Sequence, residues 1–146
     1  MNNKPKVLLI DDEPDILHVV KLLLQTEGFQ VEVAGSGEEA LKLLNENSFD
    51  ITVSDYLMPN MNGIELLKQV RASKDYTPFI FFSGNADETH SLKMTGLGAY
   101  QLLCKTNVME LADVINKTLK IDAKLTQINL SQNDEQDEFL VLLHSA

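Results

Sequence analysis

Short apolar runs recur along the chain, separated by longer stretches in which apolar residues follow helical spacing. The first run, residues 6–10, is nearly all apolar, which is typical of a parallel strand covered on both faces rather than of an alternating edge strand. The runs predict five strands, over residues 6–10, 30–34, 51–53, 79–83 and 100–104.

The amphipathic stretches between the runs predict helices. Pro14 opens the first helix and Gly28 ends it, since proline suits a first helical turn and glycine a helix end. Ser36 is a typical N-cap for the second helix. The remaining helices are predicted after Gly63, over about 87–95 and over 108–119.

Strand and helix alternate with short connections, which predicts an α/β protein with a single doubly wound, five-stranded parallel sheet and five helices. This pattern covers residues 4–121, which we predict to form one domain. Residues 122–146 break it, because 126–136 are mainly polar, 134–138 are mainly acidic and 139–143 are apolar. We expect a C-terminal extension whose apolar run either covers a patch of the domain or binds a partner.

Acidic residues stand at the ends of two of the predicted strands. Asp11 and Asp12 follow the first strand and Asp55 the third, and open α/β sheets carry their chemistry at the carboxyl ends of strands. Neighbouring carboxylates repel one another unless a cation lies between them or they share a proton, and an all-oxygen site suits Mg²⁺. One acid could hold the ion while another attacks phosphorus, because aspartate can form an aspartyl-phosphate. Ser83 and Lys105, at the ends of the last two strands, supply a hydroxyl and a cation.

Charge and cysteine content narrow the class of protein. The formal net charge of -10 argues against nucleic-acid or anionic-membrane binding, because both need a basic surface. Cys104 has no second cysteine with which to form an internal disulfide, and no apolar run approaches the ~18 residues of a membrane span. The N-terminal residues lack the pattern of a signal peptide, so we expect a cytoplasmic protein.

With these residues laid out, the chain resembles a response-regulator receiver domain, the CheY-like phosphoacceptor module of two-component signalling, over about residues 4–120. Each motif alone is weak, but their order at the ends of alternating strands is specific. The resemblance implies the flavodoxin-like strand order 2-1-3-4-5. Its marks are Asp11-Asp12, Asp55 with Met58-Pro59 and Gly63, Ser83, and Gly98-Ala99 with Lys105.

The resemblance also implies roles for the acids. Asp55 would accept a phosphoryl group from a histidine-kinase phosphohistidine or from a small acyl phosphate. Asp12, Asp55 and the backbone carbonyl of Leu57 would bind Mg²⁺, for which Mn²⁺ can substitute. Asp11 would act mainly through water.

Lys105 would pair with the phosphoacceptor and then with the phosphoryl oxygens, one of which Ser83 would hydrogen-bond. Beside this lysine the sequence departs from the family pattern. Thr106 stands where the family usually has proline after a cis bond, and we expect a trans bond here, since cis costs about 3 kcal/mol before other residues. Leu102 stands where an aromatic residue usually reports phosphorylation, and Tyr100, on the same face of the strand, is the alternative switch.

Leu57 and Asn85 occupy the two variable positions that flank the phosphoryl site in the family, and we expect them to set how easily water reaches it. Leu57 also argues against a phosphatase of the haloacid-dehalogenase kind, which needs a second acid at that place. A flavodoxin binds phosphate with the loop after its first strand, whereas residues 11–13 here are acidic and repel anions.

We interpret the chain as a single-domain response regulator that signals by phosphorylation-dependent protein binding and is not an enzyme beyond its own phosphorylation and dephosphorylation. The expected partners are a sensor histidine kinase or phosphotransfer protein and a downstream protein target. By resemblance, the partner face combines the helix near 87–95, the strand 100–104 and the last helix, and homodimerisation there is left open. A receiver that acts unphosphorylated, through its tail, is the alternative.

Overall fold

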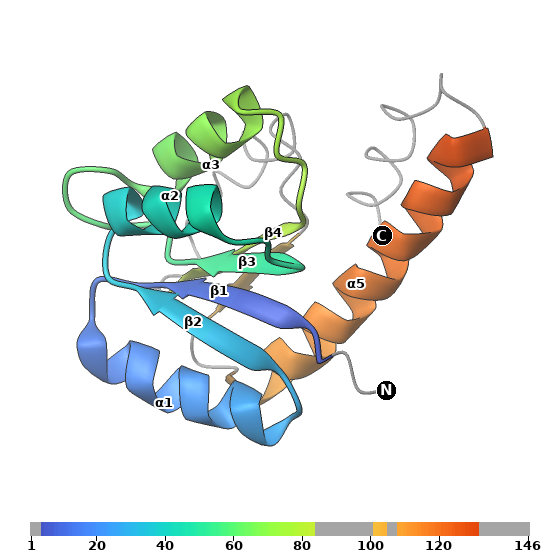
Figure 1. Ribbon diagram of the computed structural model, residues 1–146. Helices are drawn as coiled ribbons and strands as arrows, with labels where there is room; N and C mark the ends of the chain where they lie inside the picture. The colour runs from blue at the N-terminus through green and yellow to red at the C-terminus, as the bar shows by residue number, and fades with distance from the viewer. Residues whose placement is uncertain (1–3, 84–100, 105–107, 132–146) are drawn as a thin grey trace.

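The structure, a computed structural model, describes residues 4–83, 101–104 and 108–131 (Figure 1). Its centre is a parallel sheet in the order β2-β1-β3-β4-β5. The strands are β1 (Lys6–Ile10), β2 (Gln30–Ala34), β3 (Ile51–Ser54), β4 (Phe79–Ser83) and β5 (Gln101–Cys104).

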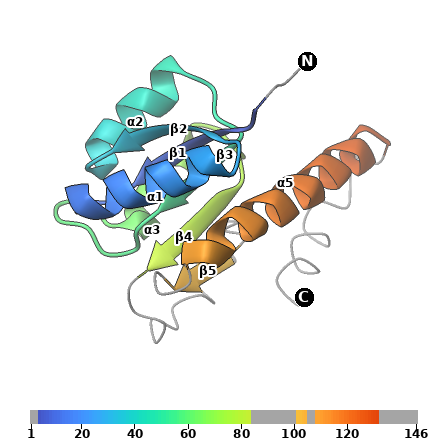
Figure 2. The same ribbon diagram turned by 90° about the horizontal axis from the view of Figure 1, so that it is seen from below.

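Helices cover both faces of this sheet (Figures 1 and 2). Side chains of α1 and α5 share one core cluster with one face of the strands, and those of α2 and α3 share a second cluster with the other face. The helices are α1 (Pro14–Thr26), α2 (Gly37–Glu46), α3 (Gly63–Ala72) and α5 (Val108–Ser131).

Local sequence explains where the helices begin and end. Pro14 lies in the first turn of α1, and Gly28 follows its end with a φ of 95°, a backbone conformation that glycine adopts without steric cost. The Ser36 side chain accepts a hydrogen bond from the Glu39 amide at 3.1 Å, so the predicted cap of α2 is confirmed. Asn62 caps α3 in the same way.

Alternation along each strand divides the core. In β1, Val7 and Leu9 face the α1–α5 cluster, whereas Leu8 and Ile10 face the α2–α3 cluster, and all four are buried. Residues one apart on a strand point to opposite faces, so an all-apolar strand serves two cores at once. The prediction of parallel strands covered on both sides is therefore confirmed.

The predicted α/β fold is also confirmed, with the strand order established for β2-β1-β3-β4. The backbone of β5 lies beside β4, whereas the helix predicted near 87–95 lies outside the described residues. The final helix does not stop near residue 119 but runs on to Ser131, across the boundary predicted at 121/122. That boundary stays a prediction. Within the described parts of the chain, no helix has the length and apolar character needed to span a membrane.

The packing of α5 leads to a stability prediction. Leu111 is fully buried, and its truncation to alanine should lower the free energy of unfolding by about 2–5 kcal/mol, because the neighbours cannot fill the cavity. Met109 on the same helix is 72% exposed, so Met109→Ala should change this free energy by less than about 0.5 kcal/mol. Urea unfolding followed by circular dichroism measures both. Equal losses would contradict the assigned core face of α5.

Candidate functional site

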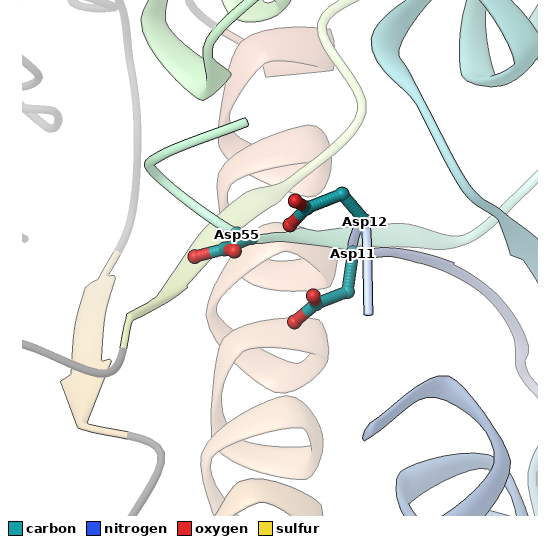
Figure 3. Close-up of side chains that lie close together, drawn as sticks. All are labelled: Asp11, Asp12 and Asp55. Atoms are coloured by element: carbon teal, nitrogen blue, oxygen red, sulfur yellow. The ribbon is translucent and has the colours of Figure 1, made fainter. Parts of the chain in front are cut away.

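Three carboxylates meet at the carboxyl edge of the sheet (Figure 3). Ile10 pairs with Ser54 in the β1–β3 register, so the residues that follow these two strands leave the sheet side by side. The Asp55 amide donates to the carbonyl of Ile10 at 2.8 Å, which continues that pairing. As a result, carboxylate oxygens of Asp11, Asp12 and Asp55 lie within 4.8 Å of one another.

The burial of these acids makes their proximity costly. Asp11 is 2% exposed and Asp55 7% exposed, whereas Asp12 is exposed to solvent. Negative charges this close repel strongly where water is largely excluded, so the cluster favours a bound cation. All the donors are oxygens, and the exposed side leaves room for water, which Mg²⁺ retains when it binds proteins. The donor set therefore fits Mg²⁺, as the sequence predicted.

Backbone and side-chain hydrogen bonds fix Asp55 in place. The Tyr56 amide donates to Asp55 Oδ1 at 2.8 Å. The hydroxyl of Ser54, which is fully buried, donates to the Asp55 carbonyl at 2.9 Å. The sequence analysis did not identify Ser54. A polar residue in a strand that is covered on both faces needs a hydrogen-bond partner, and this requirement could have pointed to it.

The loop that follows Asp55 is folded tightly onto β4. The Gly63 amide donates to the carbonyl of Tyr56 at 2.8 Å and so closes the loop. A Cβ at Gly63 would lie 2.5 Å from the Asp55 carbonyl oxygen and 2.5 Å from the Phe81 ring. Tyr56 and Phe81 also meet edge to face, with ring centroids 5.7 Å apart. Only glycine lets α3 begin this close to the acids.

The other predicted site residues are placed to different extents. Leu57 lies in the loop after Asp55 and its side chain is 59% exposed. Ser83 is the last residue of β4, so its backbone lies at the same edge of the sheet as the acids. Leu102 lies within β5, whose backbone alone is described. Three predicted site residues lie outside the described ranges: Lys105, Asn85 and Tyr100. Their roles stay predictions, and so does the trans peptide bond expected after Lys105.

Comparison with known proteins agrees with this geometry. The sequence model of the family described as "Response regulator receiver domain" matches residues 7–116. The receiver domain of the Francisella response regulator 1452 is 34% identical, with a TM-score of 0.75 over 80% of this chain and 98% of that one. The response regulator TrrA of Thermotoga maritima, solved in complex with Mg²⁺-BeF, is 30% identical, with a TM-score of 0.71 over 78% of this chain and 98% of that one.

Curated relatives are longer proteins. SaeR, a response regulator of Staphylococcus epidermidis, is 30% identical over 133 residues, which are 91% of this chain and 57% of SaeR. The transcriptional regulatory protein TrcR of Mycobacterium tuberculosis is 40% identical over 92 residues, which are 63% of this chain and 35% of TrcR. The chain thus spans between about a third and three fifths of these relatives' length.

The contact at Gly63 generates a prediction. Gly63→Ala should lower the free energy of unfolding by about 1–3 kcal/mol, because the Asp55 backbone and the Phe81 ring must move apart to admit a methyl group. It should also weaken Mg²⁺ binding measured by calorimetry, since the displaced backbone carries an acid of the site. In the matched control, Gly35→Ala, the new Cβ would have Glu39 Oε2 as its nearest atom at an ordinary 3.5 Å. If both variants bind Mg²⁺ like the parent, the proposed tight packing at the site is wrong.

Proposed function

The chain belongs to the response regulator receiver domain family, and from that premise we propose that Asp55 accepts a phosphoryl group in a Mg²⁺-dependent reaction. The observation that carries the proposal is the meeting of Asp11, Asp12 and Asp55 within 4.8 Å, with the two buried acids at the ends of adjacent strands. Receiver domains are signalling modules rather than enzymes, so the phosphorylated state itself is the product that matters.

The contacts around Asp55 suit it to act as the acceptor. In-line phosphoryl transfer needs positioning and charge neutralisation more than covalent catalysis. A carboxylate oxygen of Asp55 forms the new bond to phosphorus as the bond from phosphorus to the donor's nitrogen or acyl oxygen breaks. The Tyr56 amide and the Ser54 hydroxyl hold Asp55 in one orientation for that attack.

The proposed metal ligands are those that the family resemblance implies. We assign Asp12, Asp55 and the backbone carbonyl of Leu57 to Mg²⁺, with Asp11 acting through water. When bound, the ion supplies positive charge that offsets these acids and the phosphoryl oxygens. The Mg²⁺-BeF complex of TrrA supports a Mg²⁺ site here, since that relative is similar over most of this chain. In the proposal, Lys105 and Ser83 contact the phosphoryl oxygens from the ends of β5 and β4.

The output of the reaction is a change in protein binding. Phosphorylation adds up to about two negative charges at one fixed position, and the Ser83 hydroxyl gains a new acceptor. We propose that the donor is a sensor histidine kinase or phosphotransfer protein in the cytoplasm and that a downstream protein reads the phosphorylated state. Action as a single-domain regulator stays a prediction, because curated relatives such as SaeR extend well beyond the matched part.

Labelling of the acceptor tests this function. Incubation with acetyl phosphate and Mg²⁺ should add one phosphoryl group to the parent protein, and neither Asp55→Asn nor the parent with chelator should gain it. Asp113→Asn, which removes an exposed carboxylate on α5, should label like the parent. Intact-protein mass spectrometry reads all four samples. Equal labelling of Asp55→Asn would reject the acceptor, and a parent that stays unlabelled would favour a receiver acting without phosphorylation.

The position of Leu57 gives a second prediction. Because its side chain is 59% exposed, Leu57→Asn should cost little stability and bring a polar group beside the attacking water. Dephosphorylation should accelerate by about fivefold, equivalent to about 1 kcal/mol of activation free energy. Leu57→Met, which keeps an apolar side chain of similar volume, should decay like the parent. The decay of phosphoprotein after removal of the donor measures these rates, and identical rates for Asn and Leu would refute the role.

A further inference from the structure

The distal part of α5 carries an apolar stripe beyond the core of the domain. Among the α5 side chains that the structure describes, Leu119 is the last one packed against the α1–α5 cluster, yet the helix continues to Ser131 and runs clear of the sheet in both views (Figures 1 and 2). Ile121, Leu125 and Ile128 follow at spacings of four and three residues and so lie on one face of the helix. All three are half-buried, although neither core cluster of the described residues includes them.

A row of lysines flanks this stripe. Lys117, Lys120 and Lys124 are exposed and are also spaced by three and four residues, so they form a ridge along α5. In a chain with a formal net charge of -10, three successive cations on one helix face make a local positive surface. The distal helix therefore presents an apolar face with a basic border.

The sequence after α5 is complementary to this surface. Residues 132–138 are all polar and include four acids, and residues 139–143 are all apolar. A segment as long as 132–138 spans up to about 23–25 Å when extended, whereas the helix rises by only about 10 Å along the stripe from Ile121 to Ile128. The acidic run is thus long enough to bring the apolar run back over the stripe while α5 stays intact.

We propose that residues 139–143 dock on the stripe formed by Ile121, Leu125 and Ile128 of the same chain, with the acidic run 134–138 lying along the lysine ridge. Apolar contacts supply the attraction, and the charges set the direction in which the segment lies. The same chain is the favoured occupant, because a tethered segment has an effective concentration in the millimolar range. A second copy would have to bring another net charge of -10 against the first.

A spin label tests the docking. The isotope-labelled chain of residues 1–146 carries a nitroxide on Ser145→Cys in a Cys104→Ser background, so that it has one attachment site. Amide signals of residues 121–128 should broaden, and those of α2, on the opposite face of the sheet, should not. A mixture of isotope-labelled chains without nitroxide and unlabelled chains with it should show no broadening. Broadening in the mixture would show that a second copy of the chain binds the stripe. No broadening in the labelled chain would show that its own tail does not bind there and that the stripe is open to another protein. Either result overturns the proposal.

Charge reversal tests the predicted direction. Lys120→Glu combined with Lys124→Glu should remove most of the broadening, and adding Glu135→Lys with Glu138→Lys should restore it. Lys68→Glu on α3 is the matched control for a reversed surface charge and should leave the broadening unchanged. Broadening that survives the double reversal would refute the pairing of the acidic run with the lysines.

A further variant keeps Cys104 and carries no nitroxide, so its result does not depend on whether the spin-labelled protein folds correctly. Leu140→Asp places a charge in the apolar run, and in the chain of residues 1–146 it should shift the amide signals of residues 121–128 while those of α2 stay in place. An unchanged spectrum over 121–128 would also overturn the docking. Neither readout depends on phosphorylation of Asp55, so failure here leaves the proposed function standing.

Discussion

Repulsion between carboxylates that the sheet forces together is the constraint around which the site is built. The parallel pairing of β1 with β3 is fixed by side chains that fill two cores, and it leaves Asp11 and Asp55 no freedom to separate. The free energy of packing thus holds a charge arrangement that would not form on its own in water. A cation relieves that repulsion, and in the proposed function the same few residues would also accept the phosphoryl group.

The loop between Asp55 and α3 links this charged cluster to the neighbouring strand. Gly63 lies against both the Asp55 backbone and the Phe81 ring, and Phe81 precedes Ser83 by two residues on β4. Tyr56 packs on the same ring. Close-packed atoms therefore connect the Asp55 backbone to the strand that ends in Ser83.

Much of this arrangement could be predicted from the sequence, and the remainder depends on contacts that no local pattern encodes. The acids were found because apolar runs end at Asp11 and Asp55, and the cap of α2 because serine precedes two glutamates. The prediction that β1 and β3 are neighbours came from the family resemblance, because the periodicity of apolar residues does not determine strand order. The close fit at Gly63 arises between residues distant in sequence. The length of α5 was missed because polar residues after 121 were given more weight than the lack of any glycine or proline to stop the helix.

The division of the interior into two clusters has a consequence for how this sequence can vary. Neighbouring residues of β1 belong to different clusters, so Leu8 and Leu9 pack with separate sets of partners, one on α2 and α3 and the other on α1 and α5. A volume lost on one side can be regained only by a substitution on that side, since the sheet stands between them. Compensating replacements should therefore arise in two independent groups, and each half of the interior can change while the acids at the sheet edge keep their places.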